Sequence, residues 1–292
     1  MPLSDMTEPH TPGLSAHGYI AVVEVAVYTI ALVISVINCV RYDFKRQTGW
    51  VYLSIFCICR IVASALTIVV EESSDPSTGM ITAEMIVSNI ALTPLHLAAL
   101  GLLTTSTRLT LADTMSKVFT KLLRFCRLAL SVAIVLGIVG GVELAKDGTS
   151  QTGHTLSRVS VILITVAFAI LMSLSLFFLR FATLQPHNRM LILGVTVALP
   201  FLLVRIIYSI CYAFSSSTMS KFSTLTGDWK IYLGMDVIME FVVLAVLTTT
   251  GFLLQNYSRK RSIAQVGQGS PYERVYVRDQ EMVNSDLDSM SK

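Results

Sequence analysis

Ionisable and polar side chains occur at intervals inside segments of this sequence that are otherwise apolar. A charged group at the centre of a membrane helix costs about 2.5 to 3.5 kcal/mol even on a lenient insertion scale. Residues of this kind are therefore retained for pairing, for binding or for proton transfer. Eight of them form the candidate intramembrane site: Glu24, Arg60, Glu84, His96, Arg205, Tyr208, Asp236 and Glu240.

Depth along the helices indicates which of these charges pair. At a rise of about 1.5 Å per residue, Arg205 lies roughly 13 Å from the outer end of its segment. Asp236 lies roughly 9 Å and Glu240 roughly 15 Å from the outer end of theirs. We therefore expect Arg205 to pair with Glu240 or Asp236, and Arg60 to take the other acid. Tyr232 falls four residues before Asp236 and eight before Glu240, which predicts one polar stripe.

Two interpretations of these charges remain open. They either bind a ligand, ion or proton that enters from outside, or they only neutralise one another and hold the helices together.

Catalytic and metal-binding patterns are not found in the sequence. No nucleophile with a neighbouring base and no nucleotide-binding loop stands out. Cys57 and Cys59 have no His or further Cys at a ligand spacing, and His96 has no second ligand near it. We expect the chain not to be an enzyme and to hold no cofactor and no metal. A net charge of +3 gives no reason to expect nucleic acid as a partner.

The elements that must position the polar residues are long apolar segments. Hydrophobic residues make up 53% of the chain and charged residues 14%, against about 25% charged in soluble domains. Seven segments are long enough to cross about 30 Å of hydrocarbon. They are Tyr19 to Val40, Val51 to Val70, Ile81 to Thr105, Leu128 to Leu144, Val159 to Leu179, Leu191 to Phe214, and Lys230 to Leu254. The fold class is all-α, a polytopic bundle of seven transmembrane helices.

Loop charges predict the orientation of the bundle. Basic residues follow the first, third, fifth and seventh segments, whereas the intervening connections and the N-terminus hold few. The positive-inside rule places the N-terminus outside or in a lumen and the C-terminus in the cytosol. We expect a disordered N-terminus over residues 1–17, the membrane domain over 18–257 and a disordered cytosolic tail over 258–292. The membrane is the plasma membrane or an endomembrane of the secretory pathway.

Some positions carry expectations about packing. The fourth segment is the shortest and contains Gly137 and Gly141, a spacing that allows helices to approach closely. Trp50 lies at a segment end, where indole rings often anchor a helix among headgroups.

Several motifs together resemble a known family. They are Gly49-Trp50-Val-Tyr52 with Arg60-Ile61, Leu92-x-Pro94-Leu95 leading to Gly101-Leu102-Leu103, Leu199-Pro200-Phe201 with Arg205 and Tyr208, and Tyr232-Leu-Gly-Met235 with Glu240. The chain resembles, over about residues 18–256, a fungal seven-helix membrane family known as domain of unknown function 7702. The resemblance implies a fungal source and one seven-helix bundle, and it implies no activity. The last two predicted helices also faintly resemble those of the fungal lipid-translocating drug-resistance proteins.

Two functions fit these features. A receptor-like or sensory bundle fits seven spans, an external N-terminus and a basic connection from Arg108 to Arg127 that, with the tail, could bind a cytosolic partner. A small-solute or lipid transporter is the alternative, because Phe56-x-x-x-Arg60 and Phe201-x-x-x-Arg205 occupy corresponding places in two sets of three helices. Both predict an outward-facing polar cavity for a lipid or small molecule, in a protein embedded in a lipid bilayer.

Overall fold

Helices account for almost all of the chain that the structure describes. The computed structural model describes residues 15–41, 48–73, 77–108, 113–146, 150–181, 186–214 and 228–267, and it contains no strand within them. Its elements are α1 (Ala16–Arg41), α2 (Thr48–Glu72), α3 (Thr78–Arg108), α4 (Asp113–Lys146), α5 (Gln151–Phe181), α6 (Pro186–Phe214), α7 (Trp229–Tyr232), the π-helical turn η2 (Leu233–Val237) and α8 (Ile238–Gly267).

Seven of these helical segments, counted within the described residues, are long and apolar enough to cross a membrane. The elements α7, η2 and the first part of α8 follow one another without a break and together form the seventh. The predicted all-α class with seven transmembrane helices is confirmed.

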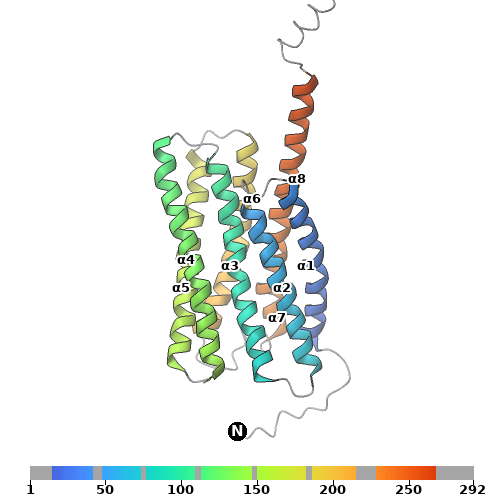
Figure 1. Cartoon of the computed structure of the whole chain (residues 1–292), viewed down its shortest axis with the longest axis vertical. Coiled ribbons are helices and arrows are strands. Elements are labelled where there is room, and N and C mark those ends of the chain that lie inside the picture. Colours follow the sequence, from blue (N-terminus) through green and yellow to red (C-terminus); the bar gives the residue numbers. More distant parts are fainter. Residues whose placement is uncertain are drawn as a thin grey trace, which may run out of the picture. The chain divides into compact units, whose positions relative to one another are not determined.

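The chain divides into two units, Met1–Thr250 and Gly251–Lys292. In the first unit, consecutive helices run in opposite directions (Figure 1). We call the end at which α1 begins the Ala16 end, and the end at which α1 stops the Arg41 end. In the second unit the described residues continue α8 as far as Gly267. Between Gly251 and Gly267 the sequence has no Gly or Pro, so the helix can extend well past the apolar segment.

The central element of the first unit is α3. Within its spanning window 78% of residues are buried, against 22 to 50% in the other six windows. It packs against α2, α4, α5 and α6. All residues from Ala91 to Thr104 on α3 are buried, because neighbouring helices cover every side of this stretch. The helix therefore needs no amphipathic pattern, and its apolar side chains point in all directions.

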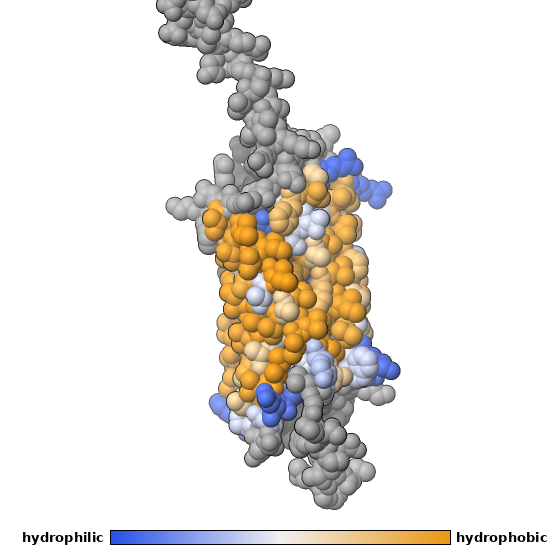
Figure 2. Space-filling view, turned by 90° about the vertical axis from the view of Figure 1, so that its right-hand side faces the viewer, coloured by the Kyte–Doolittle hydropathy of each residue, from blue (hydrophilic) through white to orange (hydrophobic). Residues whose placement is uncertain are grey.

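The outer surface of the bundle is apolar between its two ends (Figure 2). Exposed valines, isoleucines and leucines on α1, α4 and α5 form this belt, as expected for side chains that contact lipid tails. Trp50 does not belong to the surface, since its side chain is fully buried. Its interpretation as a headgroup anchor is wrong, because the indole packs inside the bundle.

The fourth helix is longer than its apolar segment. It begins at Asp113 and its spanning window starts at Val118, ten residues before the predicted start at Leu128. Lys121 and Arg124 are exposed on this added part. Long basic side chains can reach toward water from such positions. The helix can therefore extend beyond the segment that is recognised by its apolar residues.

Close approach of α4 to α5 depends on glycine. A Cβ at Gly140 would lie 3.0 Å from the Ser157 nitrogen and 3.1 Å from the Gly153 carbonyl oxygen, both backbone atoms of α5. Gly137 and Gly141 instead face Ser160 and Ile86. Gly137 and Gly141, predicted to allow close packing, therefore face two different helices, α5 and α3. Gly140 makes the closest contact with backbone atoms.

Candidate functional site

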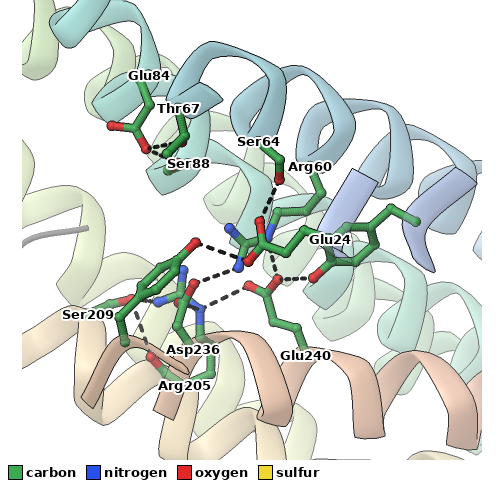
Figure 3. Close-up of polar contacts among 12 residues, drawn as sticks. Glu24, Arg60, Ser64, Thr67, Glu84, Ser88, Arg205, Ser209, Asp236 and Glu240 are labelled. Carbon is green, nitrogen blue, oxygen red and sulfur yellow. Dashed lines mark hydrogen bonds and ion pairs between the residues drawn. The ribbon is translucent and has the colours of Figure 1, made fainter. Parts of the chain in front are cut away.

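Four charged side chains meet in the interior of the bundle (Figure 3). Arg60 on α2 binds both acids of the last span: its Nη2 lies 2.6 Å from Asp236 Oδ2, and its Nε donates to Glu240 Oε2. Arg205 on α6 binds the same two acids, with Nε 2.9 Å from Glu240 Oε1 and in contact with Asp236 Oδ1. Each arginine thus bridges both carboxylates. We call these four residues the ion network.

Burial makes this arrangement unusual. Arg60, Asp236 and Glu240 are fully buried, and Arg205 is 3% exposed. Placing such charges in a low-dielectric interior carries a large desolvation penalty, which only close pairing and full hydrogen bonding can offset. The ion network meets the first condition, since two positive and two negative groups pair closely. Within the described residues, Asp236 Oδ1 contacts Arg205 Nε as an ion pair but makes no hydrogen bond.

Hydroxyl groups complete the ion network. The Tyr28 hydroxyl on α1 donates to Glu240 Oε2 at 2.9 Å, and Arg205 Nη1 donates to Ser209 Oγ at 2.8 Å. The rings of Tyr28 and Tyr208 lie 5.8 Å and 5.4 Å from the guanidinium carbons of Arg60 and Arg205. Such distances allow cation–π attraction.

Glu24 extends the polar cluster toward α1. Its side chain is buried, with Oε1 accepting from the Tyr232 hydroxyl at 3.0 Å and Oε2 accepting from Ser64 Oγ. Tyr232 also stacks at a tilt against His17, with ring centroids 5.6 Å apart. Tyr208, Tyr232 and Val237 form a small buried cluster with Ile20 and Phe241 packed against it. Of these side chains, Ile20 and Tyr232 lie nearer the Ala16 end of their helices.

The turn that carries Asp236 is not α-helical. Residues Leu233–Val237 form a π turn, in which the Ile238 N–H bonds to the carbonyl oxygen of Leu233. Tyr232, Asp236 and Glu240 span eight residues, over which an ideal α-helix drifts about 80° around its axis. The wider π turn takes up part of this drift, so the three side chains can all face the interior. Single π turns are frequent at functional positions in helices.

Besides Glu24 and Tyr208, two further predicted residues lie outside the ion network, both on α3. Glu84 on α3 contacts Ser88 and Thr67. His96 lies deeper on α3 and contacts other groups. Its Nδ1 lies 2.9 Å from the Leu92 carbonyl oxygen, and its ring packs edge-on against Phe168. Because a carbonyl can only accept, Nδ1 carries the proton and Nε2 is a buried acceptor with no hydrogen-bond partner in the structure.

The pairing predicted from depth agrees with this geometry, since Arg205 and Arg60 do meet Asp236 and Glu240. The sequence interpretation missed Ser64 and Ser209. A signal for them exists, because each serine follows its arginine by four residues, in Arg60-Ile-Val-Ala-Ser64 and Arg205-Ile-Ile-Tyr-Ser209. Residues four apart lie on one helix face. Among the described residues, no group of three or more His, Cys, Asp or Glu could hold a metal ion.

Fold and site together define a multi-pass membrane protein, a seven-helix bundle in a lipid bilayer with a buried network of charges. The chain belongs to the family described as Domain of unknown function (DUF7702), whose model matches residues 14–257. A search of curated proteins and a search of solved structures each found no match to the chain.

Proposed function

We propose that this protein is a receptor-like or sensory bundle, in which a ligand that enters from the Ala16 end changes the pairing of charges in the ion network. The observation that carries the proposal is the half of the bundle beyond the network, whose buried side chains are mostly apolar. Arg60 lies twelve residues from Glu72, or about 18 Å from the Ala16 end. On α3 the same depth falls near Ala91, where the uninterrupted run of buried residues begins.

Large apolar side chains fill this deeper half. Those exposed by 2% or less include Leu53 and Phe56 on α2, Leu95 and Leu102 on α3, Leu199 and Leu202 on α6, and Leu247 on α8. A solute that reached the network would meet mostly apolar side chains beyond it, with a few separate buried polar groups such as Asn38 and His96. A signal can still pass, because the ion network joins α2, α6, η2 and α8, and the Tyr28 hydrogen bond to Glu240 adds α1. Any change in its pairing would shift these helices together.

Loop charges support the direction of signalling. The Ala16 end faces outside or a lumen by the positive-inside rule, and the Arg41 end faces the cytosol. Lys121 and Arg124 are exposed near the Arg41 end of α4 and could bind an acidic cytosolic partner. The chain performs no catalysis in this proposal, and its ligand is a lipid or small molecule.

Ligand profiling tests the proposal. Purified protein is screened by thermal unfolding against lipids and small solutes, since a compound that binds the folded state raises the midpoint. A true ligand should lose its effect in Glu240→Gln and keep it in Glu143→Gln, a partly exposed acid in an ion pair with Lys146. In sealed liposomes the radiolabelled ligand should bind without crossing the bilayer. Saturable uptake into the liposomes would contradict the sensory function.

One observation favours the transporter alternative. The related segments around Arg60 and Arg205 come from the second helix of each set of three, and both arginines bind the same two acids. Equivalent contributions from two repeats are typical of carriers. The liposome experiment separates the two functions, because a carrier must move its substrate.

A further inference from the structure

Glu84 forms a second buried polar site, between α2 and α3 and apart from the ion network (Figure 3). Its side chain is 2% exposed. One carboxylate oxygen, Oε1, accepts from Ser88 Oγ at 2.9 Å and from Thr67 Oγ1 at 3.5 Å. The other oxygen, Oε2, is buried and has no hydrogen-bond partner among the described residues. Figure 3 shows this second oxygen directed away from the two hydroxyl groups.

The charge of Glu84 is not balanced by a basic side chain. No Lys or Arg in the described residues forms a salt bridge with it. Arg60 interacts with it from a distance, but the Arg60 guanidinium already binds Asp236 and Glu240. The buried site residues hold two arginines and four acids, so two negative charges are in excess if all are ionised. An ionised carboxylate without a counter-charge is strongly disfavoured in such an interior.

The surrounding groups are suited to a small cation. Ser88 lies one turn after Glu84 on α3, and Thr67 lies opposite on α2. Their oxygens are 2.9 Å and 3.5 Å from Glu84 Oε1. Neighbouring ligand oxygens have separations of this size when each lies about 2.3 to 2.6 Å from one hard cation. A single carboxylate with two neutral hydroxyls supplies one negative charge. This charge matches a monovalent ion better than a divalent one.

The depth of the site permits entry from the Ala16 end. Glu84 lies five residues after Gly79, and Thr67 lies five residues before Glu72. Both positions are therefore about 8 Å along their helices from that end. Tyr212 on α6 is a further titratable group that interacts with Glu84.

We propose that Glu84, Ser88 and Thr67 bind a small monovalent cation such as Na⁺. The ion supplies the missing positive charge and takes the hydroxyl oxygens as ligands, with the hydroxyl protons turned away. This binding does not depend on the sensory function, since the site lies apart from the ion network.

Cation-dependent stability tests the site. Purified protein is unfolded thermally at about pH 8, where ordinary carboxyl groups with pKa values near 4.3 are ionised, in chloride salts of Na⁺, Li⁺, K⁺ or the bulky cation N-methyl-D-glucamine at one ionic strength. We expect a saturable rise of the midpoint with a small alkali cation and none with N-methyl-D-glucamine. Glu84→Gln should abolish the rise, and its midpoint without Na⁺ should equal or exceed that of the wild type. Ser88→Ala should keep the rise but require more cation to reach it.

Glu24→Gln is the matched control, because Glu24 is also a buried acid but both of its oxygens accept hydroxyl protons. It should retain the cation response. A wild type that responds equally to all four salts would overturn the proposal and indicate that a proton neutralises Glu84. Loss of the response in Glu24→Gln but not in Glu84→Gln would also overturn it.

Discussion

At the scale of single residues, the ion network determines how the bundle responds to substitution. Removing one member of a buried ion pair leaves its partner charged and unpaired, which costs about 3 to 5 kcal/mol. Here each charge has two opposite partners, so the loss of one arginine affects both Asp236 and Glu240. Neutralising two opposite charges together restores the balance. The effects of such substitutions should therefore not be additive.

Arg205→Gln is the first prediction. It should destabilise the protein by about 3 to 5 kcal/mol, whereas the double variant with Glu240→Gln should lose less than the single variant. Thermal unfolding of the purified variants measures both. Arg180→Gln is the control, because Arg180 is exposed on α5 and should leave the midpoint unchanged. A double variant less stable than Arg205→Gln would argue against pairing.

Tyr28→Phe is the second prediction. It removes the hydroxyl that donates to Glu240 but keeps the ring against Phe56 and Phe241. Hydrogen bonds to charged groups contribute about 1.5 to 3 kcal/mol, and a loss of this size is expected in the same unfolding assay. Tyr19→Phe should have no measurable effect, because Tyr19 is 65% exposed. Equal effects of the two substitutions would show that the hydroxyl of Tyr28 does not matter.

Much of the site is predictable from residue type and depth. Charges are rare in apolar segments, so Arg60, Arg205, Asp236 and Glu240 stand out, and the rise of a helix places them at one level. The sharing of both acids by both arginines is not predictable, since it depends on the distances between three helices. The separation of Glu84 and His96 from the network has the same origin. Both residues lie on α3. At His96 a pattern of one polar face cannot be recognised, because every face is buried from Ala91 to Thr104.

At the scale of helices, the packing of α4 on α5 makes the third prediction. Gly140→Ala places a methyl group about 3 Å from backbone atoms of α5, which cannot move aside as a flexible side chain would. Overpacking of this kind costs about 1 to 3 kcal/mol, offset by up to about 1 kcal/mol from the better helix propensity of alanine. We expect a lower unfolding midpoint.

Gly234→Ala is the control for this prediction, because a Cβ at Gly234 meets nothing within 4 Å. It should be neutral or slightly stabilising. If Gly140→Ala were as stable as Gly234→Ala, the close contact between α4 and α5 would not be a constraint.

The helix ends and the π turn show what periodicity leaves out. Apolar runs locate the seven spans, but α4 starts 15 residues before Leu128. The apolar run begins only after the basic residues, whereas the helix includes them. The π turn at Leu233–Val237 leaves no composition signal. The contacts of Asp236 and Tyr232 with other helices favour the π turn, and such contacts cannot be recognised from the neighbouring residues in the sequence.

At the scale of the whole molecule, the orientation in the membrane determines from which side each site is reached. Glu84, Arg205 and Asp236 lie nearer the Ala16 end of their helices, whereas Arg60 lies at the middle of α2. The largely apolar part of the interior lies toward the Arg41 end. If the Ala16 end faces outside, ligands and ions reach both sites from outside and exposed basic residues face the cytosol. The reverse orientation would open both sites to the cytosol, and the proposed direction of signalling would be wrong.

Cysteine labelling decides the orientation and is the fourth prediction. The five native cysteines all lie within spanning helices and form no disulfide, so a membrane-impermeant maleimide should label the wild type weakly. Ser77→Cys introduces an exposed thiol at the Ala16 end, and Lys121→Cys introduces one near the Arg41 end. In intact cells with the protein at their surface, or in sealed vesicles with the lumenal face outward, Ser77→Cys should be labelled. Lys121→Cys should be labelled only after permeabilisation, because the positive-inside rule predicts that the basic end faces the cytosol. The opposite labelling pattern would reverse the orientation and place Glu84 and the ion network on the cytosolic side.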